Sequence, residues 1–180
     1  MADNHASHVS PTDSLEARLD AAVELDGADT VARRAAALLA GGYEGEDFLR
    51  VVGGAHAEGI LGGAPALYWP ELWGARALLY IWNDAATPVV IANLANQSWR
   101  VREMCAKVCA AHGLGTPKEL ARLTTDEQSR VRQAAARALV TIGDASSIGT
   151  LEVMLRDHDK EARRTAQQSL TALHTRLNEA

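Results

Sequence analysis

Two cysteines and a histidine lie close together in the stretch VREMCAKVCAAHG, residues 101–113. Cys105, Cys109 and His112 are separated by four and then three residues, which places all three on one face of a helix. These side chains bind metals or carry redox chemistry, but the same spacing also suits a helix core. Two cysteines four positions apart on a helix are poorly placed for a mutual disulfide, so we expect reduced thiols.

An internal repeat distinguishes between these interpretations. Residues 101–113 align with VRQAAARALVTIG at 131–143 and with ARRTAQQSLTALH at 162–174. The three positions hold only small or apolar residues in the other two copies: Ala135 and Ala166, Leu139 and Leu170, Ile142 and Leu173. Because a free cysteine behaves as a small buried hydrophobe, we predict that both thiols are core residues. His112, at the end of its helix before Gly113, is predicted to be a capping residue and not a metal ligand.

A second, shorter helix is expected before each copy. TPVVIANLA from Thr87 and TPKELARLT from Thr116 each begin with a threonine, which suits an N-cap, and a proline, which suits the first helical turn. The third is SSIGTLEVML. Gly113, Gly115 and Gly143 follow the longer helices as stop signals. The repeating unit is therefore a helix hairpin of about thirty residues, which must stack on its neighbours to bury its apolar face.

The stretch DEQSRVRQAAARALVTIGD, residues 126–144, resembles the HEAT repeats, in particular the short variety named after phycobilisome lyases. In that family an acidic residue in the hairpin turn and an arginine six positions later form a ladder along the stack. The corresponding positions here are Asn96 with Arg102, Asp126 with Arg132, and Asp157 with Arg163, so the first pair departs by one amide. The resemblance implies an all-α fold, and the ladder carries no chemistry.

We expect a single domain over residues 13–180, built as an α-solenoid of about four antiparallel hairpins with an N-terminal capping helix. Within it, residues 70–175 are predicted to form the regular repeats and residues 13–69 a degenerate and capping part. Residues 1–12 are expected to be a disordered tail.

The N-terminal elements are predicted from weaker patterns. SLEARLDAAVELDG, residues 14–27, has one apolar stripe and Ser14 as an N-cap, which is typical of a capping helix. Residues 29–42 and WGARALLYIW, residues 73–82, are predicted to be the second helices of two further hairpins.

Composition points to a cytoplasmic protein. Apolar residues make up 47% of the chain but aromatic residues only 4%, a balance that favours packed helices over a sheet sandwich. Residues 1–12 have no basic flank and no apolar run, and no segment approaches eighteen uninterrupted apolar residues, so we expect neither export nor membrane insertion. The net charge is −5, although residues 100–180 hold 13 of the 18 lysines and arginines.

The segment Gly53–Trp69 is the least repeat-like part of the chain. A glycine-rich loop before a helix can bind phosphate, but this segment lacks the Lys-Ser/Thr ending of a P-loop, so a long hairpin connection is favoured. His56 and Glu58 have no further ligand at metal-binding spacing, and we predict no metal and no cofactor. The role of the glycines in residues 53–63 stays open. The His-Glu dipeptides of the iron-binding HEAT-repeat deoxyhypusine hydroxylase are also absent.

All four tryptophans fall within 31 consecutive residues. Trp82 aligns with core positions and is predicted to be buried. Trp73 and Trp99 align with polar residues at the start of second helices, so their rings either contact a partner or seal the junction between two hairpins.

A basic stripe is expected along the second helices, which line the concave face of such solenoids. Its members are Arg100, Lys107, Arg130, Arg137 and Arg164, with Gln168 extending the row. The stripe suits either a phosphate backbone or long stems that cover apolar surface, and Glu103 and Glu161 interrupt it.

Three functions are consistent with these patterns. The favoured one is a non-enzymatic scaffold that binds a partner protein or peptide on the concave face through Trp73, Trp99 and the five basic residues of the stripe. The second is nucleic-acid binding or DNA repair, as in the HEAT-like alkylpurine DNA glycosylases that the architecture resembles. The third, a bilin-lyase-like enzyme, is suggested only by the family name, and no catalytic residue is predicted.

Overall fold

The structure is a computed structural model that describes residues 10–179, all of whose regular elements are helical. These residues fall into two compact units, divided between Ala86 and Thr87. No helix in the described range is long and apolar enough to cross a bilayer. The expectation of a single solenoid domain over residues 13–180 stays a prediction.

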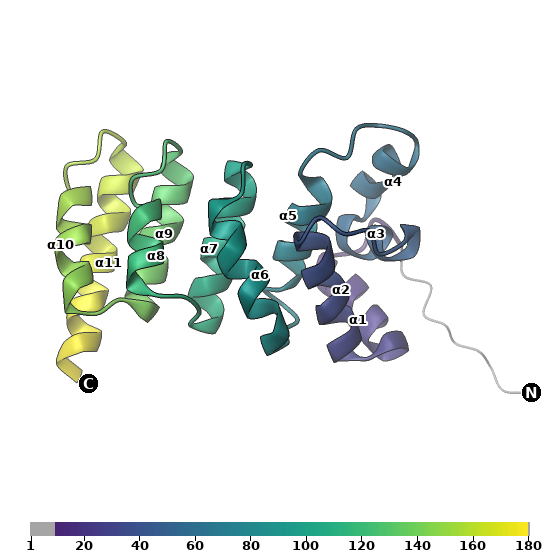
Figure 1. Cartoon of the computed structure of the whole chain (residues 1–180), viewed down its shortest axis with the longest axis horizontal. Coiled ribbons are helices and arrows are strands. Elements are labelled where there is room, and N and C mark those ends of the chain that lie inside the picture. The colour runs from purple at the N-terminus through teal and green to yellow at the C-terminus, as the bar shows by residue number, and fades with distance from the viewer. Residues whose placement is uncertain (1–9, 180) are drawn as a thin grey trace, which may run out of the picture. The chain divides into compact units, whose positions relative to one another are not determined.

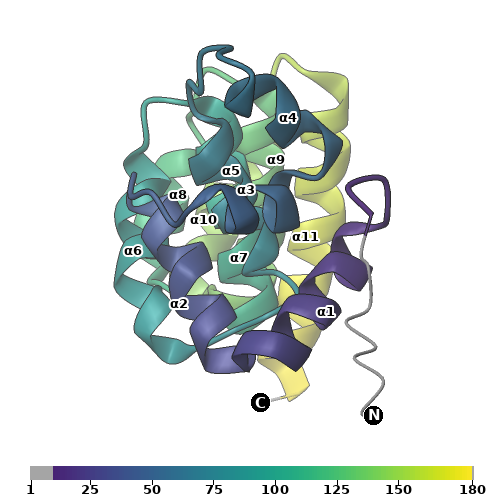
Figure 2. The same ribbon diagram turned by 90° about the vertical axis from the view of Figure 1, so that its right-hand side faces the viewer.

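The first unit contains five α-helices among its described residues. They are α1 (Leu15–Asp26), α2 (Ala28–Leu39), α3 (Glu46–Gly53), α4 (Ala55–Leu61) and α5 (Trp69–Ala77), followed by the short 3-10 helix η1 (Asp84–Ala86). Helix α2 packs along α5, and α3 contacts α1, α4 and α5 (Figure 2). The capping helix has the expected start, because Ser14 Oγ accepts a hydrogen bond of 3.2 Å from Ala17 N.

Part of the predicted N-terminal tail lies among the described residues. Residues 1–9 lie outside the described residues, whereas residues 10–12 form a turn that contacts the helices. Ala55 N donates a 3.0 Å hydrogen bond to Pro11 O, which ties this turn to the start of α4. The prediction of a disordered tail is therefore wrong for residues 10–12.

Helix α5 is shorter than the sequence pattern predicts. It ends at Ala77, five residues before Trp82, and the chain then turns into η1. Asn83 Oδ1 accepts a hydrogen bond from Ala85 N, and Trp82 Nε1 donates to Asp84 Oδ1 at 2.8 Å. These local bonds favour a turn over a continued helix. Trp82 is half-buried, so its prediction as a core residue is wrong.

The segment expected to be a long connection contains a helix. Residues 55–61 form α4, and only residues 62–68 run as an irregular loop. Gly54 separates α3 from α4 with a φ of 55°, a left-handed conformation that glycine adopts without steric cost.

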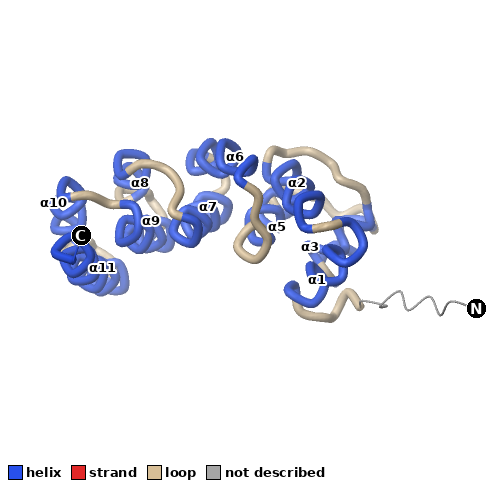
Figure 3. The backbone as a smooth tube through the Cα atoms, turned by 90° about the horizontal axis from the view of Figure 1, so that it is seen from below, coloured by secondary structure: helices blue, strands red, loops and turns tan. Residues whose placement is uncertain are grey.

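The second unit is a stack of helix hairpins. Its elements are α6 (Thr87–Ala92) with the 3-10 turn η2 (Asn93–Ala95), α7 (Trp99–His112), α8 (Pro117–Leu123), α9 (Ser129–Ile142), α10 (Ala145–Met154) and α11 (Lys160–Glu179). Helices α6, α8 and α10 lie in one layer and α7, α9 and α11 in a second (Figures 1 and 3). Within the second layer α9 packs between α7 and α11.

Local sequence explains where these helices begin and end. Thr116 and Glu119 form a capping box at α8, in which each side chain accepts a hydrogen bond from the other residue's backbone N–H. Asp144 and Ser147 cap α10 in the same way. Gly113 ends α7 in the left-handed conformation, with a φ of 65°.

The repeat alignment predicts the core of the second unit correctly. Cys105 and Cys109 are fully buried free thiols, and Ala135 and Leu139 at the equivalent positions of α9 are fully buried too. The interpretation of the cysteines as packing residues is therefore confirmed.

Candidate functional site

An arginine ladder links the hairpins of the second unit at their turns. Arg102 Nη1 donates to the carbonyl oxygens of Asn96 and Gln97 at 2.9 and 3.1 Å, which fixes the arginine on its own turn. Its Nε and Nη2 then donate to the two carboxylate oxygens of Asp126, in the next hairpin, at 2.7 and 3.0 Å. The side chain thus makes a two-pronged bond across the boundary between two hairpins.

Arg132 repeats this arrangement one hairpin further along. Its Nη1 donates to Asp126 O at 2.8 Å, and its Nε and Nη2 each lie 2.7 Å from a carboxylate oxygen of Asp157. Arg163 also bonds its own turn, through Asp157 O at 2.7 Å, but no carboxylate among the described residues pairs with it. The ladder has two complete rungs and a third arginine whose carboxylate position is open.

The ladder carboxylates are held ionised. Hydrogen bonds from Arg132 lower the pKa of Asp157, against the smaller opposing effect of burial. Burial acts to raise the pKa of Asp126, but the hydrogen bonds from Arg102 and from a backbone N–H outweigh it and the net shift is downward. Groups of this kind are structural cross-links and not general acids.

Glu103 organises the basic stripe that it was expected to interrupt. Its side chain is only 9% exposed, on the α7/α9/α11 layer. Lys107 Nζ on the same helix donates to Glu103 Oε1 at 2.7 Å, and Arg130 Nη2 from α9 donates to the same oxygen at 3.1 Å. One buried carboxylate therefore positions two cations and neutralises part of their charge.

Trp99 lies at the start of α7, beside Arg130. Its ring is half-buried and is flanked by two guanidinium groups, with Arg100 at 4.4 Å and Arg130 at 5.6 Å from the ring centroid. Both distances are within the range of cation–π attraction. We call Trp99, Arg100, Glu103, Lys107 and Arg130 the Trp99 cluster.

The remaining members of the stripe are more loosely held. Arg137 is exposed, and its Nη2 lies 3.4 Å from Thr165 Oγ1. Arg164 Nη1 lies 3.8 Å from Glu161 Oε2, and both side chains are more than half exposed. These two cations extend the charge of the Trp99 cluster along α9 and α11.

Trp73 does not belong to any such surface. Its side chain is buried, with only 6% of the residue exposed, and its ring packs on the backbone of Gly53 so closely that a Cβ there would lie 2.6 Å from a ring carbon. The prediction of Trp73 as a partner-binding residue is wrong. Its alignment with polar residues was misleading because α3, which has no counterpart in the regular hairpins, packs over this position.

The cysteines have no reactive environment. Burial, with a further contribution from Glu119, raises the pKa of Cys109 to about 12. The described residues hold no group of three or more His, Cys, Asp and Glu side chains placed to bind a metal ion. His112 is half-buried at the end of α7.

Comparison with known proteins supports the repeat assignment. A family model described as HEAT repeats matches residues 87–171, from the start of α6 into α11. No curated protein matches the chain.

Similar solved structures include crystal structures of two engineered proteins. One is 20% identical and aligns over 92% of this chain and 86% of its own, with a TM-score of 0.52. The other is 19% identical and aligns over 92% and 88%, with a TM-score of 0.55. At these identities the likeness concerns the fold alone, which is an all-α helical-repeat fold. Residues 87–171 of this chain are therefore similar to HEAT repeats.

Proposed function

We propose that this protein is a non-enzymatic scaffold that binds an acidic peptide segment of a partner protein on its α7/α9/α11 layer, the layer expected to be concave. The observation that carries the proposal is the Trp99 cluster. A large aromatic ring stands between two guanidinium groups, one of which is also held by a buried carboxylate. Such a ring and its arginines can bury a large area with little loss of side-chain freedom, because they are already held in place.

The charge of the surface favours an acidic partner. Lys107 and Arg130 share a single carboxylate, Glu103, and Arg100 and Arg137 add two exposed cations on α7 and α9, in a protein whose net charge is negative. A complementary acidic segment would be steered to this layer and would form charge-assisted hydrogen bonds with the guanidinium groups.

Nucleic-acid binding is the second candidate, and the geometry weakens it. A phosphate backbone is bound through cations whose charge is available to release counterions. Lys107 and Arg130 both donate to Glu103, so two members of the stripe are already partly neutralised. The binding of an acidic peptide depends less on the number of unpaired cations than the binding of a phosphate backbone does, because the Trp99 ring also contributes contact area.

The test compares labelled acidic peptides with labelled single- and double-stranded DNA by fluorescence polarisation over a salt series. We expect saturable binding of an acidic peptide, weakened roughly thirtyfold by Trp99→Ala, since central tryptophans contribute on the order of 2 kcal/mol or more. Arg122→Ala is the matched control, because Arg122 is an exposed arginine on α8 in the other layer.

The outcomes separate the candidates. DNA binding that falls steeply with salt and is lost in Arg137→Glu would replace the peptide proposal with the nucleic-acid one. Equal loss in Trp99→Ala and Arg122→Ala, or no binding of any acidic peptide, would contradict the assignment of the surface.

A further inference from the structure

The first unit contains a pocket whose wall holds positive charge and no carboxylate. Its volume is about 320 Å³, and it lies where the junction of α3 and α4 meets α1 and α5. Arg18, His56 and Arg76 line it together with the buried ring of Trp73, and none of the described residues in its wall is acidic.

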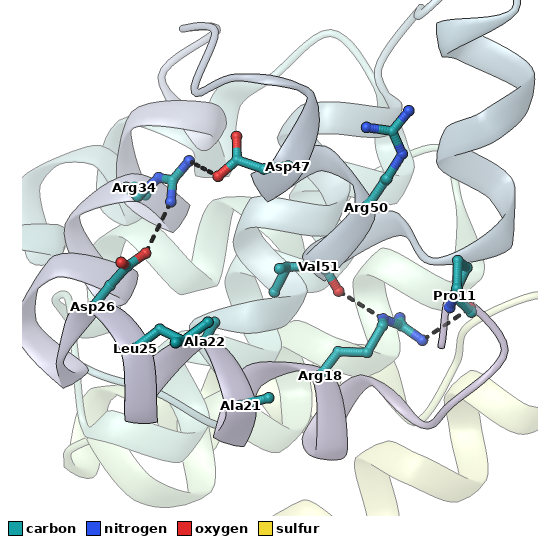
Figure 4. Close-up of a pocket in the computed structure, with 10 residues that line it drawn as sticks. All are labelled: Pro11, Arg18, Ala21, Ala22, Leu25, Asp26, Arg34, Asp47, Arg50 and Val51. Atoms are coloured by element: carbon teal, nitrogen blue, oxygen red, sulfur yellow. Dashed lines mark hydrogen bonds and ion pairs between the residues drawn. The ribbon is translucent and has the colours of Figure 1, made fainter. Parts of the chain in front are cut away.

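Arg18 is fixed in this wall by neutral partners. Its Nε donates to Val51 O at 2.7 Å, and its Nη1 donates to Pro11 O (Figure 4). The same Nη1 also donates to Asp13 O. These are backbone carbonyls, so the charge of the guanidinium is not matched by a directly bonded carboxylate. Gly54 allows this placement, because a Cβ there would lie 2.8 Å from the guanidinium carbon.

Arg76 brings a second guanidinium to the same pocket from α5. Its side chain is exposed and forms no hydrogen bond or ion pair with any residue in the described range 10–179. Burial lowers the pKa of Arg18, and the repulsion from the nearby positive charge of Arg76 lowers it further, against a smaller opposing effect of the Asp13 carboxylate. An anion between them would remove this repulsion.

We propose that this pocket binds a phosphate group, either free or at the end of a small phosphomonoester. A phosphate carries close to two negative charges at neutral pH and matches two guanidinium groups, whereas a single carboxylate would leave one of them unneutralised. Trp73 and Val52 supply apolar wall on which the remainder of a small ligand would rest. This site lies within the first unit and does not depend on the function proposed for the second.

The experiment is a calorimetric titration of the full chain with inorganic phosphate and, separately, with glycerol phosphate. Acetate at matched ionic strength serves as the single-carboxylate probe. The diagnostic variant is Arg76→Glu. It removes no hydrogen bond or ion pair among the described residues, so the variant is expected to fold. The matched control is Arg33→Glu, an exposed arginine of α2 whose hydrogen-bond partners, Asp29 O and Thr30 Oγ1, lie on its own helix.

We expect saturable binding of at least one phosphate probe. Arg76→Glu should weaken this binding tenfold or more, because it removes charge-assisted hydrogen bonds to the phosphate that together contribute roughly 1.4 kcal/mol or more. Arg33→Glu should change the affinity by less than about twofold. The tighter of the two probes identifies the source of the phosphate. No saturable binding, equal effects of the two variants, or acetate binding as tightly as phosphate would each overturn the proposal.

Discussion

At the scale of single residues, the ladder arginines explain how one side chain joins two hairpins. Arg102 and Arg132 each bond their own turn through Nη1 and donate through Nε and Nη2 to a carboxylate of the next hairpin. Arg132 and Asp157 are both buried, so their pairing satisfies two charges that would otherwise be stranded away from water.

Removing one partner of this pair should therefore be costly. Arg132→Ala leaves the buried carboxylate of Asp157 without its counter-charge, and we expect a loss of about 3–5 kcal/mol in the free energy of unfolding. Arg163→Ala is the matched comparison, because it removes the same turn bonds without stranding a carboxylate, and should cost about 1 kcal/mol. Urea unfolding of both variants measures the difference, and equal losses would show that the ladder carboxylates contribute nothing.

The same pairs predict a dependence of stability on pH. The pKa values of Asp126 and Asp157 are lowered in the folded protein, so the unfolded chain binds protons more readily than the folded one. The stability that the pairs provide is complete above the unfolded carboxyl value of about 3.9 and is lost as pH falls through the lower folded values. Unfolding curves between pH 7 and pH 2 should show this loss. In Arg132→Ala the free energy of unfolding should depend less steeply on pH over the same range.

The thiols give an independent check of the core. Because Cys105 and Cys109 are fully buried and burial raises the pKa of Cys109 to about 12, both should react slowly with a thiol reagent in the folded protein and rapidly in denaturant. A colorimetric thiol assay with and without denaturant tests this. Rapid reaction of either cysteine under native conditions would contradict its placement in the core.

At the scale of elements, regular helices were predictable where the start signal and the periodicity agree. Thr116 followed by Pro117 gives the start of α8, and Gly113 gives the end of α7, because capping is local chemistry. Trp82 shows where this fails. Its pattern continues the helix, but the turn formed by Asn83 ends it, and a side-chain bond of this kind leaves little trace in hydrophobic periodicity.

The break between α3 and α4 rests on one glycine, which provides a further prediction. Gly54→Ala puts a Cβ at a φ of 55° and within 2.7 Å of Pro11 O, so it should lower the free energy of unfolding by roughly 1–3 kcal/mol. Gly59→Ala is the control, because Gly59 lies within α4 with nothing near its Cβ position and alanine there favours the helix. In thermal unfolding, the melting temperature should be highest for Gly59→Ala, intermediate for the unsubstituted chain and lowest for Gly54→Ala. The reverse order would contradict the close contact at Gly54.

At the scale of the whole molecule, the repeat alignment predicted the second unit better than the first. Residues 101–113 have two further copies to support them, so an ambiguous pair of cysteines could be resolved by comparison. In the first unit the alignment reached only residues 73–82, and there it misplaced both Trp73 and Trp82. Arg18, His56 and Arg76 are separated by 38 and 20 positions in the sequence, and only the packing of α1, α4 and α5 brings them to one pocket.

The division into units predicts that residues 87–180 fold without the rest of the chain. Their hairpins form one compact unit whose ladder rungs lie within it. We expect this fragment to show a helical circular-dichroism spectrum and a cooperative thermal transition. A broad, non-cooperative transition would show that the second unit needs the first to complete its core.

Each paired ladder arginine forms hydrogen bonds with two successive hairpins, and this has a consequence for how such a chain can gain further repeats. Arg132 takes its anchoring carbonyl from the hairpin before a boundary and its carboxylate from the hairpin after it. A tandem duplication of residues 116–143 would therefore bring one new ladder arginine and one new ladder aspartate, and every existing rung would keep its chemistry. Growth by copying needs no compensating mutation at the junction, and Arg163 marks the place where another copy could be added.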